Sequence, residues 1–381
     1  MENVENLVSH DHGNTIETII STLEDELGYR VIGVTIDEEG NYDYSRESLV
    51  RNTRNFGLPQ NRPRVYIMGF SKKKYGTAIK LLNKQLPLTS NETIFRDVNA
   101  VLEENVDDKY YMAQGYLDTL KRHKERNEKN GNGFGYCVLN QTGEEHPVAY
   151  TILATGGSGK ERNLIFQPKE GVSGKKLSTK KTALNSEGIR MMTPTEWGRL
   201  QGFIGYGFLD EAGNDTFSFP EGTTDGQKYK QFGNSVSIPV IKSMAEFMLE
   251  CFQTLERQQT EVIRALANNN EYIVKRDVME MLDLNQVQAG ALLKRMVEYK
   301  YLIRVSSGKT TRYVKYQKNV KLSAYSQEEK VLEIFKKKKM ICNKDVQETL
   351  GISGGSANVL LSGMVKKSLI KRVARGQYRK Q

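Results

Sequence analysis

The chain has 381 residues, of which 38% are apolar and 27% charged, a composition typical of a globular protein with room for two or three domains. It contains no apolar run long enough to cross a bilayer and no basic-then-apolar leader, which argues against a membrane or secreted protein and predicts a cytoplasmic location. Its three cysteines and four histidines are scattered, so neither a disulfide framework nor a metal site is expected.

The charge is unevenly distributed along the chain. The net charge is +10, but residues 253–381 hold 26 Lys+Arg against 12 Asp+Glu, or +14, which leaves −4 for residues 1–252. Within that first part, residues 71–189 hold 19 basic against 14 acidic residues, or +5. Such asymmetry indicates a polyanionic partner, above all nucleic acid, although a solubilising basic tail would give the same count.

Helix and strand patterns alternate along the first 70 residues. Apolar residues at helical spacing predict a helix over residues 14–28, and residues 29–36 are typical of a strand. Residues 37–55 are polar and predict a loop, whereas the apolar run 64–70 predicts a buried strand. This alternation is typical of an α/β layer.

The pattern changes from residue 71 onward. The basic stretches 121–136 and 156–163 are interrupted by glycines, so we expect exposed loops there. Residues 231–252 combine a Gly-Asn turn with a following helix. A Thr-Pro start signal predicts another short helix, whose buried face would hold Trp197, Leu200 and Phe203.

The last part of the chain contains an internal repeat, because residues 276–308 align without gaps on residues 344–376. Each copy predicts a helix, a turn, a second helix and a hairpin with a glycine at its tip, which resembles a winged-helix module. The second helices, roughly 286–299 and 354–366, are then candidates to enter a DNA groove, and the hairpins to touch phosphates. A protein-docking role is the alternative.

Four segments resemble signature blocks of the DNA (cytosine-5) methyltransferase family, and they occur in the family's order. They are ENVENL (2–7), GLPQNRPRVYIMGF (57–70), RMMTPTEWGRLQGF (190–203) and QFGNSVSIPVI (231–241). One such match would be weak, but four in order leave little room for coincidence. The stretch GNGFGY (131–136) and the pair Thr151-Ile152 are similar to the family's target-recognition region.

The resemblance implies an α/β fold: a partial Rossmann-like, S-adenosylmethionine-dependent methyltransferase domain with a small target-recognition domain. The implied reaction transfers a methyl group from S-adenosylmethionine to C5 of a cytosine flipped out of double-stranded DNA, in a bacterial restriction–modification setting. Glu2 would face N3 and the exocyclic amine of the cytosine and donate a proton to N3. Arg64 would hydrogen-bond O2, and Arg62 would organise the pocket and a nearby phosphate.

The resemblance also implies residues for the cofactor and for DNA. Asn234 and Ser235 would help line the S-adenosylmethionine pocket. The region 71–189 would read the DNA sequence, with glycine-rich loops that allow a close approach of the backbone. The candidate DNA contacts in this region are Lys121, Arg122, Lys124, Arg126, Thr151, Lys160 and Arg162.

Two further blocks of the family are not found in the sequence: the glycine-rich cofactor turn and the Pro-Cys dipeptide that carries the nucleophile. Three explanations stay open. An upstream-encoded partner subunit could carry these blocks, the chain could be a truncated and inactive remnant, or it could be a non-catalytic, sequence-specific DNA-binding protein. The first two are favoured, because a break inside a sheet would leave an apolar strand edge unpaired in a lone chain.

The expected domain organisation has five regions. The methyltransferase domain would comprise residues 1–70 and 190–252, on either side of the target-recognition domain at 71–189. The two winged-helix-like repeats would occupy residues 253–320 and 321–381.

Overall fold

The computed structural model describes the chain except residues 83, 134–135, 155–159, 308–309, 317–326 and 375. The described residues form two compact units. The first unit comprises Met1–Leu27, Val31–Gly69 and Lys84–Cys251, and the second comprises Gly28–Arg30, Phe70–Asn83 and Phe252–Gln381.

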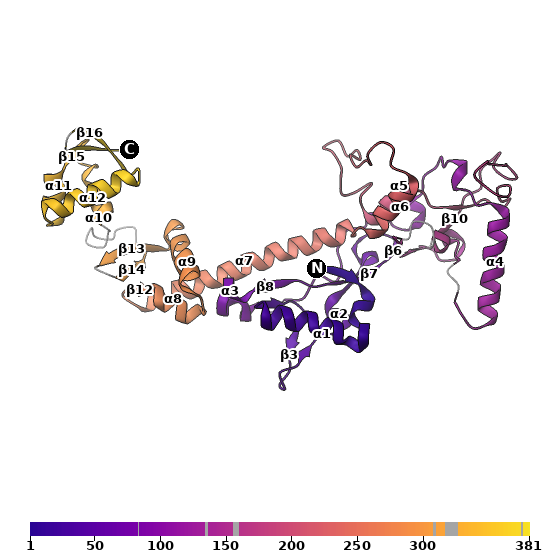
Figure 1. Cartoon of the computed structure of the whole chain (residues 1–381), viewed down its shortest axis with the longest axis horizontal. Coiled ribbons are helices and arrows are strands. Elements are labelled where there is room, and N and C mark those ends of the chain that lie inside the picture. The colour runs from indigo at the N-terminus through magenta and orange to yellow at the C-terminus, as the bar shows by residue number, and fades with distance from the viewer. Residues whose placement is uncertain (83, 134–135, 155–159, 308–309, 317–326, 375) are drawn as a thin grey trace. The chain divides into compact units, whose positions relative to one another are not determined.

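A small antiparallel sheet and helix α1, with shorter helical segments, form the N-terminal part of the first unit (Figure 1). The sheet has the order β1-β7-β5, with β1 at Glu2–Val4, β7 at Pro63–Tyr66 and β5 at Val50–Asn52. Helix α1 (Asn14–Ser21) continues through a wider turn at Thr22–Glu26, as the apolar spacing predicted. The core between them consists of buried apolar side chains: Ile16, Ile20, Val31, Val34, Leu49, Val65 and Ile67.

Two predictions for this part need correction. Residues 37–55 are not a plain loop, because they contain β4 (Tyr42–Asp43), α2 (Arg46–Leu49) and β5. The predicted strand over 29–36 is divided into β2 (Tyr29–Val31) and β3 (Thr35–Ile36). Gly33 lies between them with φ at 81°, a left-handed conformation that glycine adopts without steric cost and that breaks the extended run.

The rest of the first unit is built around short elements. The helices are α4 (Gln114–Lys129), α5 (Pro194–Gln201) and α6 (Asp225–Asn234), and the strands are β6 (Gln60–Asn61), β9 (Ala149–Tyr150), β10 (Leu164–Phe166) and β11 (Ile189–Met191). Strands β6 and β9 pair in parallel, and β10 and β11 pair antiparallel. Their core includes Trp197 and Leu200, as predicted, and the partly buried Phe203 packs against it.

The basic stretch from residue 121 was predicted to be a loop, and this is wrong for residues 121–129. They form the second half of α4, whose Leu117 and Leu120 are buried. Lys, Arg and Glu are good helix formers, and the first glycine of the stretch comes only at residue 131. The remaining glycine-rich segments fall partly on 134–135 and 155–159, which lie outside the described residues.

The second unit contains two sets of elements with the same order. Helix α7 (Ile238–Asn269), whose residues from Phe252 onward belong to this unit, is followed by β12 (Ile273–Val274), α8 (Lys275–Leu282), α9 (Gln286–Glu298), β13 (Leu302–Ser307) and β14 (Thr310–Lys315). The second set is α10 (Gln327–Ile334), β15 (Ile341–Cys342), α11 (Asn343–Leu350), α12 (Gly354–Lys366), β16 (Ile370–Ala374) and β17 (Gln377–Lys380). The unit also includes α3 (Lys72–Tyr75) and most of β8 (Gly69–Ser71).

Each set folds around its own core and has its own three-stranded antiparallel sheet, with the orders β12-β14-β13 and β15-β17-β16. The predicted second helices are therefore confirmed as α9 and α12, and the predicted hairpins as β13–β14 and β16–β17. Each set also has a first helix, which is the end of α7 in one and α10 in the other. The expected boundary at residues 320–321 lies outside the described residues.

In the described part of the chain, none of the helices is both long and apolar enough to cross a membrane. The same residues contain no group of three or more His, Cys, Asp or Glu side chains that could hold a metal ion.

Candidate active site and its junction with the recognition region

Two of the candidate catalytic residues meet across neighbouring strands. Strand β1 pairs with β7 so that Glu2 is opposite Tyr66 and Val4 is opposite Arg64. Glu2 and Arg64 are thus diagonal neighbours on one face of the sheet, and Nε of Arg64 lies 3.2 Å from Oε1 of Glu2. Their side chains are only 24% and 14% exposed, so strand pairing creates a sheltered carboxylate–guanidinium pair.

The carboxylate of this pair can accept a further hydrogen bond. The buried Oε1 of Glu2 has no hydrogen-bond partner of good geometry among the described residues. Burial lowers the pKa of Arg64, and burial together with the nearby Glu2 raises the pKa of Tyr66. The site therefore offers a carboxylate and a guanidinium, side by side, to a planar polar ligand.

Arg62, the third candidate, connects segments of the chain that are far apart in sequence through hydrogen bonds, and this contact is called here the junction. The residue is 3% exposed, and its guanidinium donates hydrogen bonds to the carbonyl oxygens of Ile152 at 3.0 Å, Gly233 at 3.1 Å and Ser235 at 2.8 Å. Burial, with a smaller contribution from the neighbouring positive charge of Arg64, lowers the pKa of Arg62 to about 10. The guanidinium is thus occupied by backbone carbonyls of the recognition region and the last block, and not directed at a phosphate.

Gln60 completes this junction, and the sequence analysis assigned it no role. Its side chain is fully buried, accepts the backbone N–H of Ile152 at 3.2 Å and donates to the carbonyl of Leu200 at 2.8 Å. Beside it, the hydroxyl of Thr151 donates to the carbonyl of Asn61 at 2.7 Å. The only sequence signal was the place of Gln60 in the Pro-Gln-x-Arg-x-Arg block, next to the arginines.

The candidate cofactor residues lie at the end of α6. The expected Gly-Asn turn is wrong, since Gly233 and Asn234 are the last residues of that helix and Ser235 caps it. Gly233 is required for a different reason: a Cβ there would lie 2.4 Å from the carbonyl carbon of Leu153. Close packing of α6 on the recognition region therefore excludes any side chain.

Asn234 and Ser235 do not form a cofactor pocket by themselves. Asn234 is exposed, and the Ser235 hydroxyl donates to the carbonyl of Phe232 at 2.7 Å. Neither residue lines the pockets on β5, beside α5 and α6, at the end of α7 or beside α1. These two residues by themselves therefore do not provide an enclosed site for S-adenosylmethionine.

A buried ion pair supports the block at residues 190–203. Arg190 and Glu196 are both fully buried and form two hydrogen bonds, at 2.6 and 2.9 Å. Glu196 also accepts the backbone N–H of Thr193 at 2.8 Å, and the Thr193 hydroxyl accepts that of Glu196 at 3.2 Å, a capping box at the start of α5. The helix start predicted at the Thr-Pro pair is confirmed, whereas the sequence analysis assigned no role to Glu196 or to its partner Arg190.

The candidate DNA contacts are not gathered at one point. Lys121 forms an ion pair with Glu187 at 2.5 Å, and Lys124 lies 3.9 Å from Glu128, so each has a protein carboxylate nearby. The side chain of Lys160 lies outside the described residues. Of the other candidates, Arg122, Arg126 and Arg162 are exposed and have no ion-pair partner among the described residues, and Arg122 donates a hydrogen bond to Thr119 at 3.3 Å.

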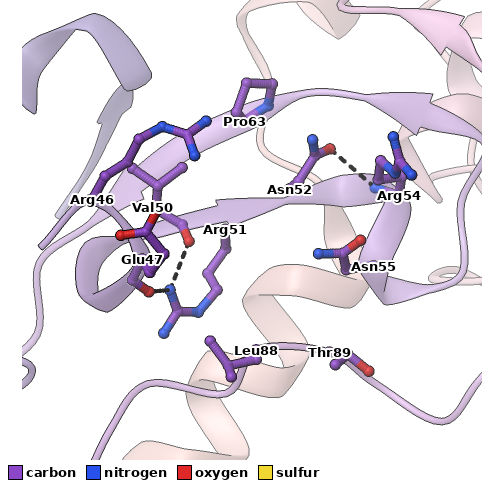
Figure 2. Close-up of a pocket in the computed structure, with 10 residues that line it drawn as sticks. All are labelled: Arg46, Glu47, Val50, Arg51, Asn52, Arg54, Asn55, Pro63, Leu88 and Thr89. Atoms are coloured by element: carbon purple, nitrogen blue, oxygen red, sulfur yellow. Dashed lines mark hydrogen bonds between the residues drawn. The ribbon is translucent and has the colours of Figure 1, made fainter.

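A cationic pocket of about 480 Å³ lies beside the junction, on β5 and the segments around it (Figure 2). The Arg51 guanidinium is not available to a ligand in this pocket, because it donates hydrogen bonds to the backbone carbonyls of Glu47, Val50 and Leu86, among others. Arg54 is exposed at the pocket edge. The pocket contains none of Glu2, Arg62 and Arg64 and is separate from the candidate catalytic pair. The residues that line it are Arg46, Glu47, Val50, Arg51, Asn52, Arg54, Asn55, Pro63, Leu88 and Thr89.

Comparison with known proteins identifies the family of the chain. The family model described as C-5 cytosine-specific DNA methylase matches residues 1–250, about two thirds of the chain, and the chain belongs to this family. The match supports an S-adenosylmethionine-dependent methyltransferase fold for the matched residues, and members of the family use S-adenosylmethionine as methyl donor.

Several relatives show the same likeness. Type II methyltransferase M.HpaII of Haemophilus parainfluenzae is 38% identical over 257 residues, which cover 66% of this chain and 59% of the relative. Type II methyltransferase M1.ScrFI of Lactococcus lactis subsp. cremoris is 34% identical over 253 residues, 66% of this chain and 51% of the relative. The chain thus spans between half and three fifths of the length of these relatives.

Among solved structures, the Dnmt2 methyltransferase of S. pombe matches 65% of each chain, at 15% identity and a TM-score of 0.37. This likeness is too low to support an argument, so the assignment rests on the sequence family.

Proposed function

We propose that this chain supplies the cytosine-recognition and target-recognition parts of a DNA (cytosine-5) methyltransferase of the restriction–modification type. The observation that carries the proposal is the Glu2–Arg64 pair, in which residues 62 positions apart meet on neighbouring strands. A flipped cytosine presents O2, N3 and the exocyclic amine along one edge. A carboxyl group and a guanidinium held side by side match that edge, with Arg64 on O2 and Glu2 on N3 and the amine.

Each residue then has one task. Glu2, when protonated, donates its proton to N3, which makes C6 more electrophilic. Arg64 holds the ring in place, since a guanidinium presents its N–H donors in a fixed plane. Arg62 does not touch the base in this proposal. It holds the recognition region and the end of α6 against the strand that carries Arg64, and so acts as a positioning residue.

The reaction requires groups that this sequence does not contain. No cysteine follows a proline in the 381 residues, and Asn234 and Ser235 do not complete a cofactor pocket. S-adenosylmethionine, when bound, supplies the methyl group. We propose that its binding turn and the nucleophilic cysteine come from an upstream-encoded polypeptide, and that this chain alone is inactive.

The proposal extends to the domain plan. Residues 1–70 and 190–252 would form the methyltransferase part, and 71–189 the target-recognition part. The two C-terminal sets of elements would be winged-helix modules, because each has the order helix, strand, helix, helix and hairpin.

Expression of the chain in a host, alone and together with the product of the gene immediately upstream, tests the proposal. Bisulfite sequencing of host DNA should show 5-methylcytosine at one short site only when both are present. Methylation by this chain alone, or in neither case, would contradict it.

A matched pair of variants tests the role of Glu2. In the active combination, Glu2→Gln should lower the methylation rate by about 10²–10⁴-fold, because the amide cannot donate a proton to N3 as an acid does. Glu5→Gln is the control, since Glu5 is a nearby carboxylate that pairs with Arg46. Equal loss in both variants would count against a specific role for Glu2.

A further inference from the structure

The two C-terminal sets of elements share a fold but differ in charge. Residues 327–381, the second set, hold 13 Lys+Arg against 5 Asp+Glu, or +8, whereas residues 259–315 of the first set hold 10 against 6, or +4. The acidic residues of the second set all lie at or before Glu348. Its last helix and its hairpin therefore carry positive charge without a single carboxylate side chain.

The β16–β17 hairpin places two of these cations opposite each other on its outer face. Lys371 and Arg379 are directly opposite each other across the two strands. Ile370 and Tyr378, their neighbours along the strands, are 1% and 6% exposed and pack into the core, so the alternation of side chains directs Lys371 and Arg379 outward. Both are exposed.

Lys371 and Arg379, called here the basic hairpin face, have no ion-pair partner in the part of the chain that the structure describes. Other lysines of the same set do have one: Lys338 pairs with Asp345 and Lys367 with Glu328 at 2.6 Å. Like charges directly opposite each other destabilise a hairpin. The folded second set therefore retains the repulsion between Lys371 and Arg379.

The first set shows that the fold does not require this pair. The strand orders are the same, and Leu302 pairs with Lys315 as Ile370 pairs with Lys380. The next pair, which corresponds to Lys371–Arg379, is Ile303–Val314, and it is uncharged. The remaining pairs of that hairpin are also free of opposed cations. The two hairpins thus share a fold, but only the second has two cations directly opposite each other, which points to different tasks.

We propose that the basic hairpin face binds the phosphate backbone of double-stranded DNA and that the equivalent hairpin of the first set does not. A polyanion places negative charge next to Lys371 and Arg379, for which the described part of the chain provides no carboxylate partner. Duplex DNA is favoured over other polyanions because the first 250 residues of the same chain belong to a DNA methylase family. The contact is independent of base sequence, and it stands whether or not the chain takes part in methyl transfer.

The salt dependence of binding tests this proposal on the full chain. Fluorescence anisotropy would measure affinity for a labelled duplex of arbitrary sequence over a series of salt concentrations. Lys371→Ala/Arg379→Ala should reduce the slope of log K against log salt by about 1.8, or about 0.9 for each lost phosphate contact. The matched control, Arg304→Ala/Lys315→Ala in the first set, removes the same charge and should leave the slope unchanged.

Thermal unfolding separates binding from folding. Because the double variant removes a repulsion, its melting temperature should stay equal or rise while its DNA binding falls. An equal loss of slope in the control variant, an unchanged slope in the double variant, or a fall in melting temperature that accompanies the lost binding would each overturn the proposal. Tighter binding of single-stranded DNA or of RNA than of the duplex would overturn the choice of ligand.

Discussion

Removal of the Arg62 side chain should destabilise the first unit strongly. Arg62→Ala leaves the carbonyls of Ile152 and Gly233 without the donor that they have at 3.0 and 3.1 Å, and it leaves the carbonyl of Ser235 with Nε2 of Gln201 at 3.4 Å. An unsatisfied buried acceptor costs about 1–3 kcal/mol, so about 2 kcal/mol for each of the first two gives a loss of about 4 kcal/mol in the free energy of unfolding. Arg62→Lys should recover only part of this loss, because one ammonium group lacks the planar fork that reaches two segments.

The single tryptophan of the chain provides the assay. Trp197 is buried in the core that also contains Phe232, next to Gly233, so its fluorescence reports unfolding of this region in urea. With an m value of about 2 kcal/mol/M, a loss of 4 kcal/mol lowers the midpoint by about 2 M. Arg54→Ala, at an exposed arginine, should move it by less than about 0.3 M. A midpoint for Arg62→Ala within that range of the parent, or full recovery by Arg62→Lys, would refute the reasoning.

Three more predictions concern packing, a buried charge and pH. Gly233→Ala should destabilise the first unit and increase its susceptibility to proteolysis, because the new Cβ would lie 2.4 Å from a backbone carbon. Gly226→Ala in the same helix is the control. Its Cβ would have no neighbouring atom within 4 Å, so this variant should be neutral or stabilising by up to about 1 kcal/mol. Glu196→Gln should lower the free energy of unfolding by about 3–5 kcal/mol, measured by the same tryptophan fluorescence, because it leaves the buried Arg190 charge unpaired; a loss below 1 kcal/mol would argue against an ion pair. The hydrogen bonds from Lys338 and from a backbone N–H lower the pKa of Asp345 to about 2. This carboxylate therefore stabilises the fold above its ordinary pKa near 3.8, and the contribution is lost as pH falls from about 4 to 2. The carboxyl carbon shift in an NMR titration should show the low pKa, and an ordinary value would contradict the prediction.

Local patterns predicted many of the helices and hairpins correctly. The apolar spacing of residues 14–28, the Thr-Pro start of α5 and the duplicated pattern of α9 and α12 all depend on near neighbours in the chain, which a sequence displays directly. The failures are also local in origin. Residues 37–55 resemble a loop because they are mostly polar and because β5 is only three residues long. The glycines after α4 suggested a loop over the whole basic stretch, although the residues before them are good helix formers and belong to α4.

The sequence by itself determined the chemical groups and the family, since four signature blocks stand in order along the first 250 residues. It could not show what those groups touch. Arg62 and Arg64 are two residues apart and chemically identical, yet one is buried among carbonyls and the other lies beside a carboxylate. Strand register and the packing of segments up to 173 residues apart decide that difference, and so does the steric demand at Gly233. Only the tertiary structure contains such long-range contacts, because they depend on which segments the folded chain brings together.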